Sequence, residues 1–189
     1  MREGKAKVLS ESELKRVYII ASDNRMAKRD VCLLDFSFKL GLRVKEMASL
    51  MIDDVINENG KIRDSFHLKA DQSKGKNGRY VYLSNKKLRK NLENYLASRD
   101  KDLNRHLFKS QKTIFSANSL QQLFKRLYNK AGINGAKSHS GRRTFATTLI
   151  EKGFDIKSVS VLMGHSNIQT TARYITENPV RLGEMVKNI

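Results

Sequence analysis

Helical segments that end at glycine are the feature that most constrains the fold of this chain. Apolar residues recur at the spacing of one helix face over most of its length. Four of these segments are followed directly by a glycine, at Gly41, Gly132, Gly153 and Gly164. Glycine readily takes the left-handed backbone conformation that closes a helix. The pattern therefore predicts a mostly α-helical protein.

The expected helices cover both halves of the chain. Ser10 and Glu13 have the spacing of a capping box, and the first helix follows them. Further helices are expected at about residues 29–40, 43–51, 85–99, 119–131, 141–152, 156–163, 167–176 and 180–189. Residues 60–84 differ, because two short runs, KIRDSFHLK and GRYVYLS, flank the polar stretch DQSKGKNG. This arrangement predicts a small antiparallel β-sheet with a basic hairpin, and hence a mostly α fold of the α+β class.

The 189 residues are expected to form one continuous domain, because a chain of this length has little room for a second core. There is no internal repeat and no linker rich in proline or glycine, and the only proline is Pro179. The expected domain spans residues 1–189, with residues 1–9 as an N-terminal tail and residues 179–189 as a C-terminal tail.

A large excess of basic residues indicates a polyanionic partner. Lys and Arg number 37 against 19 acidic residues, which gives a formal net charge of +18 and a pI of about 10.1. Ribosomal proteins, nucleases and membrane-surface proteins share such an excess, so charge alone selects no function. A general RNA- or ribosome-binding protein would explain the charge and nothing else.

The single cysteine and the absence of long apolar runs indicate the compartment. Cys32 cannot form an internal disulfide or a four-cysteine zinc site, and it lies within an apolar run, so we expect a buried thiol in a reducing compartment. The N-terminus lacks the apolar core of a signal peptide, and no apolar run approaches a bilayer span. We expect a cytoplasmic protein with no membrane association, located on the nucleoid if the source is bacterial.

Several short motifs place groups that bind phosphate at the ends of helices. His139 and Arg142 are three residues apart at a helix start, where the positive end of the helix dipole favours an anion. Arg43 follows Gly41 at another helix start, and Glu46 is placed one turn later to brace its guanidinium. Taken singly, these motifs are equally compatible with a chance spacing or an ordinary surface ion pair.

Three further residues complete the set. His165 follows Gly164 directly, and Tyr174 lies nine positions later. Lys74 lies in the basic hairpin. Alone, Tyr174 would be interpreted as a half-buried aromatic residue and Lys74 as part of a solvated turn.

The joint order of these motifs resembles the tyrosine recombinases, also called the phage integrase family. The resemblance runs from about Leu9 to Tyr174. The segment HSGRRTFATTL is similar to the family's His-x-Leu-Arg-His-x-Phe-Ala-Thr box, and LMGHSNIQTTARY matches its Leu-Gly-His-x-x-x-x-Thr-Thr-x-x-Tyr box without a gap. The resemblance implies the catalytic-domain fold of DNA breaking–rejoining enzymes and a site-specific recombinase that acts on double-stranded DNA.

The chemistry of these side chains fits that activity. Arg43 and Arg142 remain protonated and can each present two donors to the nonbridging oxygens of a phosphodiester. His139 and His165 can donate further hydrogen bonds, and His139 could also accept the tyrosine proton. Tyr174 would attack the phosphorus and form a 3′-phosphotyrosine, which conserves the bond energy so that rejoining needs no ATP.

The remaining roles concern the leaving group and the support of the arginines. A lysine can protonate the leaving 5′-oxygen, and Lys74 fits the family's Lys-Gly-x-x-x-Arg pattern better than Lys76 does. The resemblance gives Glu46 a supporting position behind Arg43. Because guanidinium groups take the place of a metal and no acidic cluster has the pattern of a metal site, we expect cleavage without a metal or any other cofactor.

The chain departs from the family pattern in two respects. Most members carry an N-terminal DNA-clamping domain, whereas only about nine residues precede the first expected helix here, so we expect either a natural minimal recombinase or a truncated one. Within the His-x-x-Arg box, Gly141 and Arg143 replace the commoner leucine and histidine, and Gly141 is expected to weaken the helix start.

Partners follow from the resemblance. In the family, the C-terminal tail often docks on a neighbouring protomer, so we expect residues 179–189 to link dimers or tetramers on DNA, with accessory DNA-bending proteins as further partners. Two alternatives stay open, namely a type IB topoisomerase and a DNA-binding protein that keeps the fold without catalysis.

Overall fold

The computed structural model describes residues 6–69, 78–99, 105–111 and 113–174. The elements in chain order are α1 (Glu11–Ser22), α2 (Ala27–Lys39), α3 (Val44–Ser49), α4 (Ile52–Val55), β1 (Ser65–Leu68), β2 (Arg79–Tyr82), α5 (Lys86–Ala97), α6 (Ala117–Lys130), α7 (Ser140–Glu151), α8 (Ile156–Met163) and α9 (Ile168–Ala172). The expected fold class, mostly α with a small antiparallel sheet, is confirmed. Among the described residues, no helix is long and apolar enough to cross a membrane.

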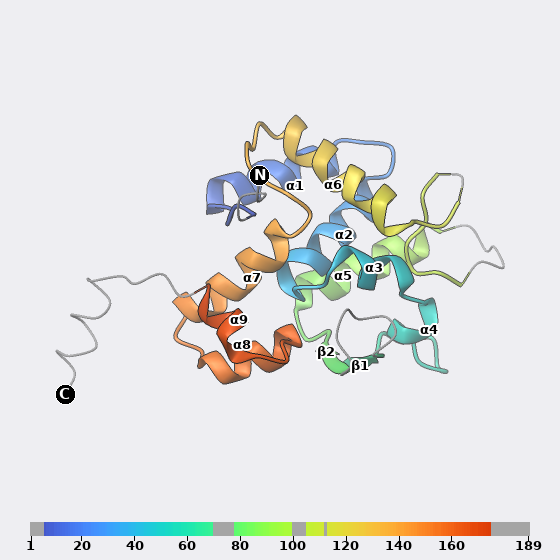
Figure 1. Ribbon diagram of the computed structural model, residues 1–189. Coiled ribbons are helices and arrows are strands. Elements are labelled where there is room, and N and C mark those ends of the chain that lie inside the picture. Colours follow the sequence, from blue (N-terminus) through green and yellow to red (C-terminus); the bar gives the residue numbers. More distant parts are fainter. Residues whose placement is uncertain (1–5, 70–77, 100–104, 112, 175–189) are drawn as a thin grey trace.

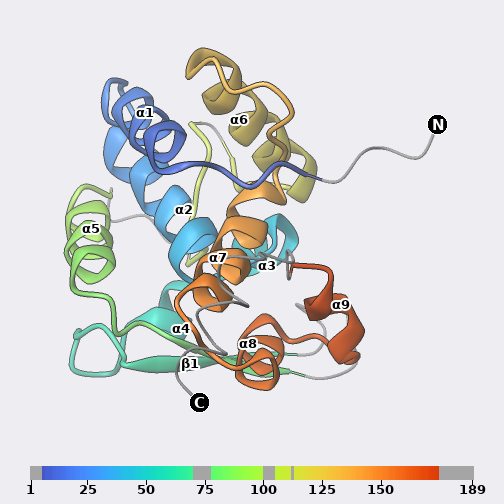
Figure 2. The ribbon, with the colours of Figure 1, turned by 90° about the vertical axis from the view of Figure 1, so that its left-hand side faces the viewer.

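Helix α2 lies at the centre of the molecule and is packed by α1, α3, α5 and α7 (Figures 1 and 2). Most of its side chains are buried, including Cys32 as expected, together with Leu33, Leu34 and Phe36. Phe36 meets the ring of Phe108 edge-on, with the ring centroids 5.1 Å apart. Burial on nearly all sides also encloses the polar residues of this helix, namely Arg29, Asp30, Asp35 and Ser37.

The two strands pair antiparallel, with Phe66 opposite Val81 and His67 opposite Tyr80. Side chains alternate between buried and exposed along both strands, as expected for a ribbon with one face on the core. The inward face carries one charged residue, Arg79, at the start of β2. The segment that joins the strands lies outside the described residues, and so does the tail at 179–189.

A second, smaller core lies between α7 and α8. It consists of Ala146, Ile150, Val159 and Met163, and Tyr174 packs against its edge. In Figure 1, α7, α8 and α9 lie together at one corner of the molecule, in the orange part of the ribbon, and α8 contacts β2. This corner holds most of the sequence motifs.

Several helix boundaries differ from the expected ones. The capping box of Ser10 and Glu13 is confirmed, with hydrogen bonds of 3.3 and 3.1 Å in the two directions. Helix α6 starts two residues early, because Ser116 caps it, and the short α4 was not anticipated.

The expected helix at 167–176 is too long. Helix α9 ends at Ala172, and Tyr174 lies in a turn in which its N–H donates to the carbonyl of Thr171 at 2.9 Å. The short i to i+3 hydrogen bond tightens the chain and ends the α-helical ladder. The nucleophile candidate is therefore carried by a turn and not by a continuous helix.

Candidate active site

Arg142 is a buried guanidinium that joins two glycine turns. Its Nη1 donates to the carbonyl of Gly41 at 2.6 Å, and its Nη2 donates to the carbonyl of Met163. Gly41 and Gly164 both have positive φ, at 64° and 59°, so each turn follows the left-handed path that only glycine takes readily. Burial, and then the charge of Arg43, lower the pKa of Arg142 to about 9, which still leaves it protonated at neutral pH.

Gly141 has a packing role that the sequence did not reveal. A Cβ at this position would lie 2.0 Å from Oγ of Ser37 and 2.9 Å from its Cβ. The first turn of α7 therefore lies directly on α2, and a leucine there would not fit. The expectation that Gly141 merely weakens the helix start is incomplete, because the close contact sets the position of Arg142.

Arg43 and Glu46 form the brace that their spacing predicted. Glu46 is fully buried, and it accepts hydrogen bonds from the backbone N–H of Arg43 at 2.8 Å and from Nη1 of Arg43 at 2.7 Å. The Arg43 side chain keeps 20% of its surface exposed. Glu46 therefore fixes one end of the guanidinium while part of the side chain stays accessible.

A third arginine, Arg79, joins this cluster and was missed as a site residue. Its two terminal nitrogens donate to the two oxygens of Glu46 at 2.9 and 2.8 Å. Burial alone would raise the pKa of Glu46, but the hydrogen bonds and charge of Arg79 outweigh it and lower the pKa to about 2. The signal available in the sequence was the Lys-Gly-x-x-x-Arg pattern that starts at Lys74, because its arginine is Arg79.

His165 is half-buried in the turn between α8 and α9. Its Nδ1 lies 2.8 Å from the hydroxyl of Thr171, so the Nε2 edge is left to meet a ligand. Burial, followed by the charges of Arg142 and Arg43, lowers its pKa to about 4, so the ring is neutral at physiological pH. The ring stacks on Tyr174, with centroids 6.1 Å apart and planes 20° apart.

Tyr174 shares a cavity of about 220 Å³ with the His-x-x-Arg motif. The cavity is lined by Ala6, His139, Arg142, Arg143, Thr170, Arg173 and Tyr174. His139 is exposed at the N-terminus of α7. Arg143, whose role the sequence left open, donates to the carbonyl of Ala6 at 2.7 Å and so ties the N-terminal segment to the cavity wall.

The cluster has an excess of positive charge. Arg43, Arg79 and Arg142 face a single buried carboxylate, Glu46. Lys74 lies outside the described residues. Among the residues that are described, no three His, Cys, Asp or Glu side chains gather as metal ligands would. The arrangement can bind a phosphate between guanidinium and imidazole groups beside a phenol.

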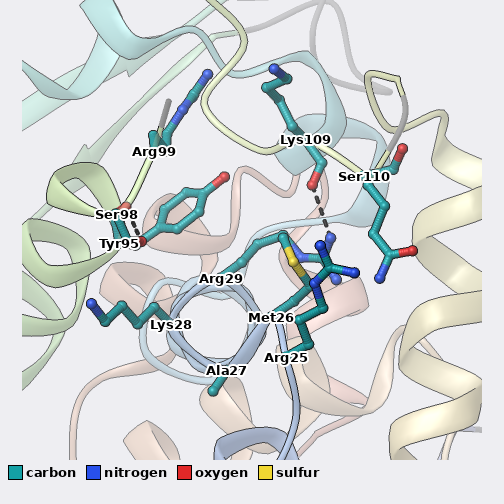
Figure 3. Close-up of a pocket in the computed structure, with 11 residues that line it drawn as sticks. Arg25, Met26, Ala27, Lys28, Arg29, Tyr95, Ser98, Arg99, Lys109 and Ser110 are labelled. Carbon is teal, nitrogen blue, oxygen red and sulfur yellow. Dashed lines mark hydrogen bonds between the residues drawn. The ribbon is translucent and has the colours of Figure 1, made fainter. Parts of the chain in front are cut away.

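Another basic cavity, of about 680 Å³, lies at the opposite end of α2 (Figure 3). Its buried arginine, Arg29, pairs with Asp30 at 2.7 Å and donates to the carbonyl of Lys109 at 3.0 Å. Arg29 also lies over the ring of Phe115. None of the sequence-predicted site residues lines this cavity, and its buried guanidinium is used within the protein.

The chain is similar to known tyrosine recombinases over most of its length. The chain is 34% identical to the tyrosine recombinase XerA of Pyrococcus horikoshii over 185 residues, which are 96% of this chain and 60% of the relative. The tyrosine recombinase of Pseudothermotoga lettingae is 33% identical over 88% of this chain and 55% of the relative. The chain thus spans somewhat more than half the length of these relatives.

Solved structures show the same fold. The crystal structure of XerA recombinase superposes with a TM-score of 0.77 at 29% identity, covering 100% of this chain and 65% of that one. XerH site-specific recombinase bound to its difH substrate, in a pre-cleavage complex, superposes with a TM-score of 0.74 at 26% identity, covering 98% of this chain and 55% of that one. The profile of the phage integrase family matches residues 7–181. The chain therefore belongs to the phage integrase family.

Proposed function

We propose that this domain is a site-specific DNA recombinase that cleaves and rejoins DNA strands through a covalent 3′-phosphotyrosine at Tyr174. The observation that carries the proposal is the shared cavity of His139, Arg142 and Tyr174. Arg43, braced by Glu46, and neutral His165 add further donors at the same corner. The relatives named above, which are recombinases by name, support the same activity.

The chemistry begins with charge neutralisation. A DNA phosphodiester repels a nucleophile until cations absorb the charge that develops on its nonbridging oxygens. Arg142 is placed by two backbone carbonyls and Arg43 by Glu46, so neither has to be ordered when DNA arrives. This preorganisation is what separates the cluster from ordinary surface arginines.

Strand exchange then consists of two reciprocal transfers. The phenol oxygen of Tyr174 bonds to phosphorus as the bond to the 5′-oxygen breaks. The phenol proton passes to a base, for which His139 is the candidate, and the 5′-oxygen takes a proton from Lys74. A 5′-hydroxyl from another strand reverses these steps. Neither water nor a nucleotide cofactor is consumed, and we propose that no metal takes part.

Double-stranded DNA is the proposed substrate, bound in the cytoplasm on the basic surface of the domain. The net charge of +18 predicts that affinity falls steeply with salt, because each neutralised phosphate releases counterions. We further propose that residues 179–189 dock on a neighbouring protomer in DNA-bound dimers or tetramers. Deletion of residues 179–189 is expected to remove the higher oligomers on DNA in native gels, and unchanged oligomers would contradict the docking.

Covalent trapping tests the activity directly. The protein is mixed, with EDTA present, with labelled nicked duplexes that tile the DNA flanking its own gene, and the products are separated in SDS. A shifted protein–DNA band that disappears with Tyr174→Phe is expected. A band that persists in Tyr174→Phe, or one that needs Mg²⁺, would contradict the mechanism.

The type IB topoisomerase activity is a second candidate, because it would use the same phosphotyrosine chemistry. Relaxation of a supercoiled plasmid that lacks any cleavage site found by trapping separates the two. A recombinase is expected to leave that plasmid supercoiled, whereas a topoisomerase would relax it.

A further inference from the structure

Arg79 forms the most complete ion pair in the described part of the site, yet the proposed reaction gives it no role. Its side chain is 5% exposed and that of Glu46 is 0% exposed. The two parallel hydrogen bonds, of 2.9 and 2.8 Å, use both carboxylate oxygens. A two-point contact of this kind fixes the orientation of the carboxylate as well as its charge.

Glu46 passes this constraint on to Arg43. The oxygen that accepts from Nη1 of Arg79 also accepts from Nη1 of Arg43 at 2.7 Å, and the other oxygen accepts from the backbone N–H of Arg43. The two guanidinium groups therefore share one buried anion. A rotation of the carboxylate would move the Arg43 side chain and the first turn of α3 together.

Arg79 also connects two other parts of the site. It is the first residue of β2, five positions after Lys74, and its stem passes close to Gly164 in the turn that presents His165. A Cβ at Gly164 would lie only 2.8 Å from Cδ of Arg79. One buried side chain thus sets the spacing between the sheet, the helix start at Arg43 and the histidine turn.

We propose that Arg79 is a positioning residue for DNA cleavage, which acts through Glu46 to hold Arg43 in its phosphate-binding orientation. The proposal rests on the proposed recombinase function. The Arg79 side chain is 5% exposed and both of its terminal nitrogens donate to Glu46, so its effect on the rate is expected to be indirect.

The physical consequence of losing Arg79 is a change in the charge of Glu46. A buried carboxylate left with one partially exposed guanidinium is poorly compensated and takes up a proton more readily. A protonated Glu46 would bind Arg43 less tightly, because a charge-assisted hydrogen bond becomes a neutral one. Cleavage by an Arg79 variant should then gain a pH dependence that the wild type lacks and that disappears when residue 46 cannot titrate.

Single-turnover cleavage of a nicked duplex, at saturating protein, tests this role with Arg79→Met. The rate constant is expected to fall about 100-fold, since a misplaced phosphate-binding group costs this much. The DNA dissociation constant should change by less than about threefold. The ratio of variant to wild-type rate should also fall further as the pH is lowered, and Glu46→Gln in the same background should remove this additional pH dependence.

Three comparisons separate positioning from a general loss of structure. Arg79→Lys keeps the charge and should restore the wild-type pH profile with part of the rate. Arg89→Met removes another arginine that braces the sheet, through the carbonyls of Ile62 and Leu83, but bonds to no site residue, and it should leave the rate unchanged. In an Arg43→Ala background, adding Arg79→Met should change the cleavage rate very little, because both substitutions act on the same phosphate-binding group.

An activity-independent measurement completes the test. The carboxyl carbon of Glu46, followed by NMR in wild type and in Arg79→Met, should titrate near or above the ordinary glutamate pKa of about 4.3 only in the variant. An unchanged titration, or wild-type cleavage by Arg79→Met, would overturn the role of Arg79. Failure of wild type to form a covalent product would instead contradict the proposed recombinase function.

Discussion

The two ends of α2 each hold a buried arginine–carboxylate group, and they differ in how the charges balance. At the N-terminal end, Arg29 pairs with Asp30 and contacts a carbonyl and a phenylalanine ring, so one buried cation meets one buried anion. At the C-terminal end, Glu46 is shared by Arg43 and Arg79, and Arg142 is held by carbonyls alone. The balanced pair, Arg29 and Asp30, is expected to stabilise the fold. The unbalanced cluster around Glu46 keeps a net positive charge that is available to bind an anionic ligand.

The carboxylates respond to these surroundings in opposite directions. Burial raises the pKa of Asp30 in spite of the charge and hydrogen bond of Arg29. The pKa of Glu46 is lowered to about 2, because the arginines outweigh its burial. Burial alone therefore does not set the pKa of a carboxylate here. The number of cationic partners and the geometry of their hydrogen bonds decide whether the pKa rises or falls.

The largest expected effect is the loss of cleavage in Arg142→Lys. A lysine keeps the charge but cannot bond to both carbonyls and still present donors to a phosphate. The single-turnover cleavage rate is expected to fall at least about 1,000-fold, with a circular dichroism spectrum like that of the wild type. A rate within tenfold of wild type would contradict the assigned role.

At the balanced end of α2, Arg29→Met should affect stability and not chemistry. Breaking a buried pair leaves Asp30 uncompensated and is expected to cost about 3–5 kcal/mol in the free energy of unfolding. Urea denaturation measures this loss. The cleavage rate of the folded fraction should equal that of the wild type, and a slower rate would mean that the two ends are coupled.

The pH dependence of stability should have opposite signs at the two carboxylates. Glu46 has a lowered pKa in the folded state, so its stabilising contribution is present above about pH 4.3 and is lost as the pH falls towards 2. Integrated over that window, the loss is about 3 kcal/mol.

Asp30 has a raised pKa, so its contribution is present at acid pH and is lost as the pH rises. Unfolding of Glu46→Gln and Asp30→Asn, each compared with wild type across pH 2–7, measures both slopes. If the two carboxylates changed the free energy of unfolding in the same direction with pH, the proposed difference between the two ends of α2 would be wrong.

The smallest expected effects come from glycine turns near and far from the cluster. Gly164→Ala and Gly132→Ala both place a Cβ at positive φ, at 59° and 65°, which costs about 1 kcal/mol each. Only at Gly164 does the new Cβ meet Arg79, whereas nothing lies within 4 Å at Gly132. We expect about a tenfold lower cleavage rate for Gly164→Ala and an unchanged rate for Gly132→Ala. Equal cleavage rates for the two variants would show that Arg79 can move away from the new Cβ at residue 164 without loss of activity.

Much of the site could be predicted because its signals are local. Gly41 and Gly164 close helices by backbone geometry alone, and the contact of Glu46 with Arg43 needs only the spacing of one helical turn. The pairing of Glu46 with Arg79 joins residues 33 positions apart, and the contact of Gly141 with Ser37 spans more than 100. No periodicity in a single sequence encodes such distances, so both were missed.

The sequence by itself determined the helical pattern, the glycine turns, the excess of charge and the order of the motifs, because each depends on neighbouring residues or on composition. The tertiary structure decided which charges are balanced. It placed Arg79 behind Glu46, seated Arg142 on the carbonyls of Gly41 and Met163, and made Tyr174 a turn residue beside His165. Burial and distance set the strength of a charge interaction, and both exist only once distant segments have packed together.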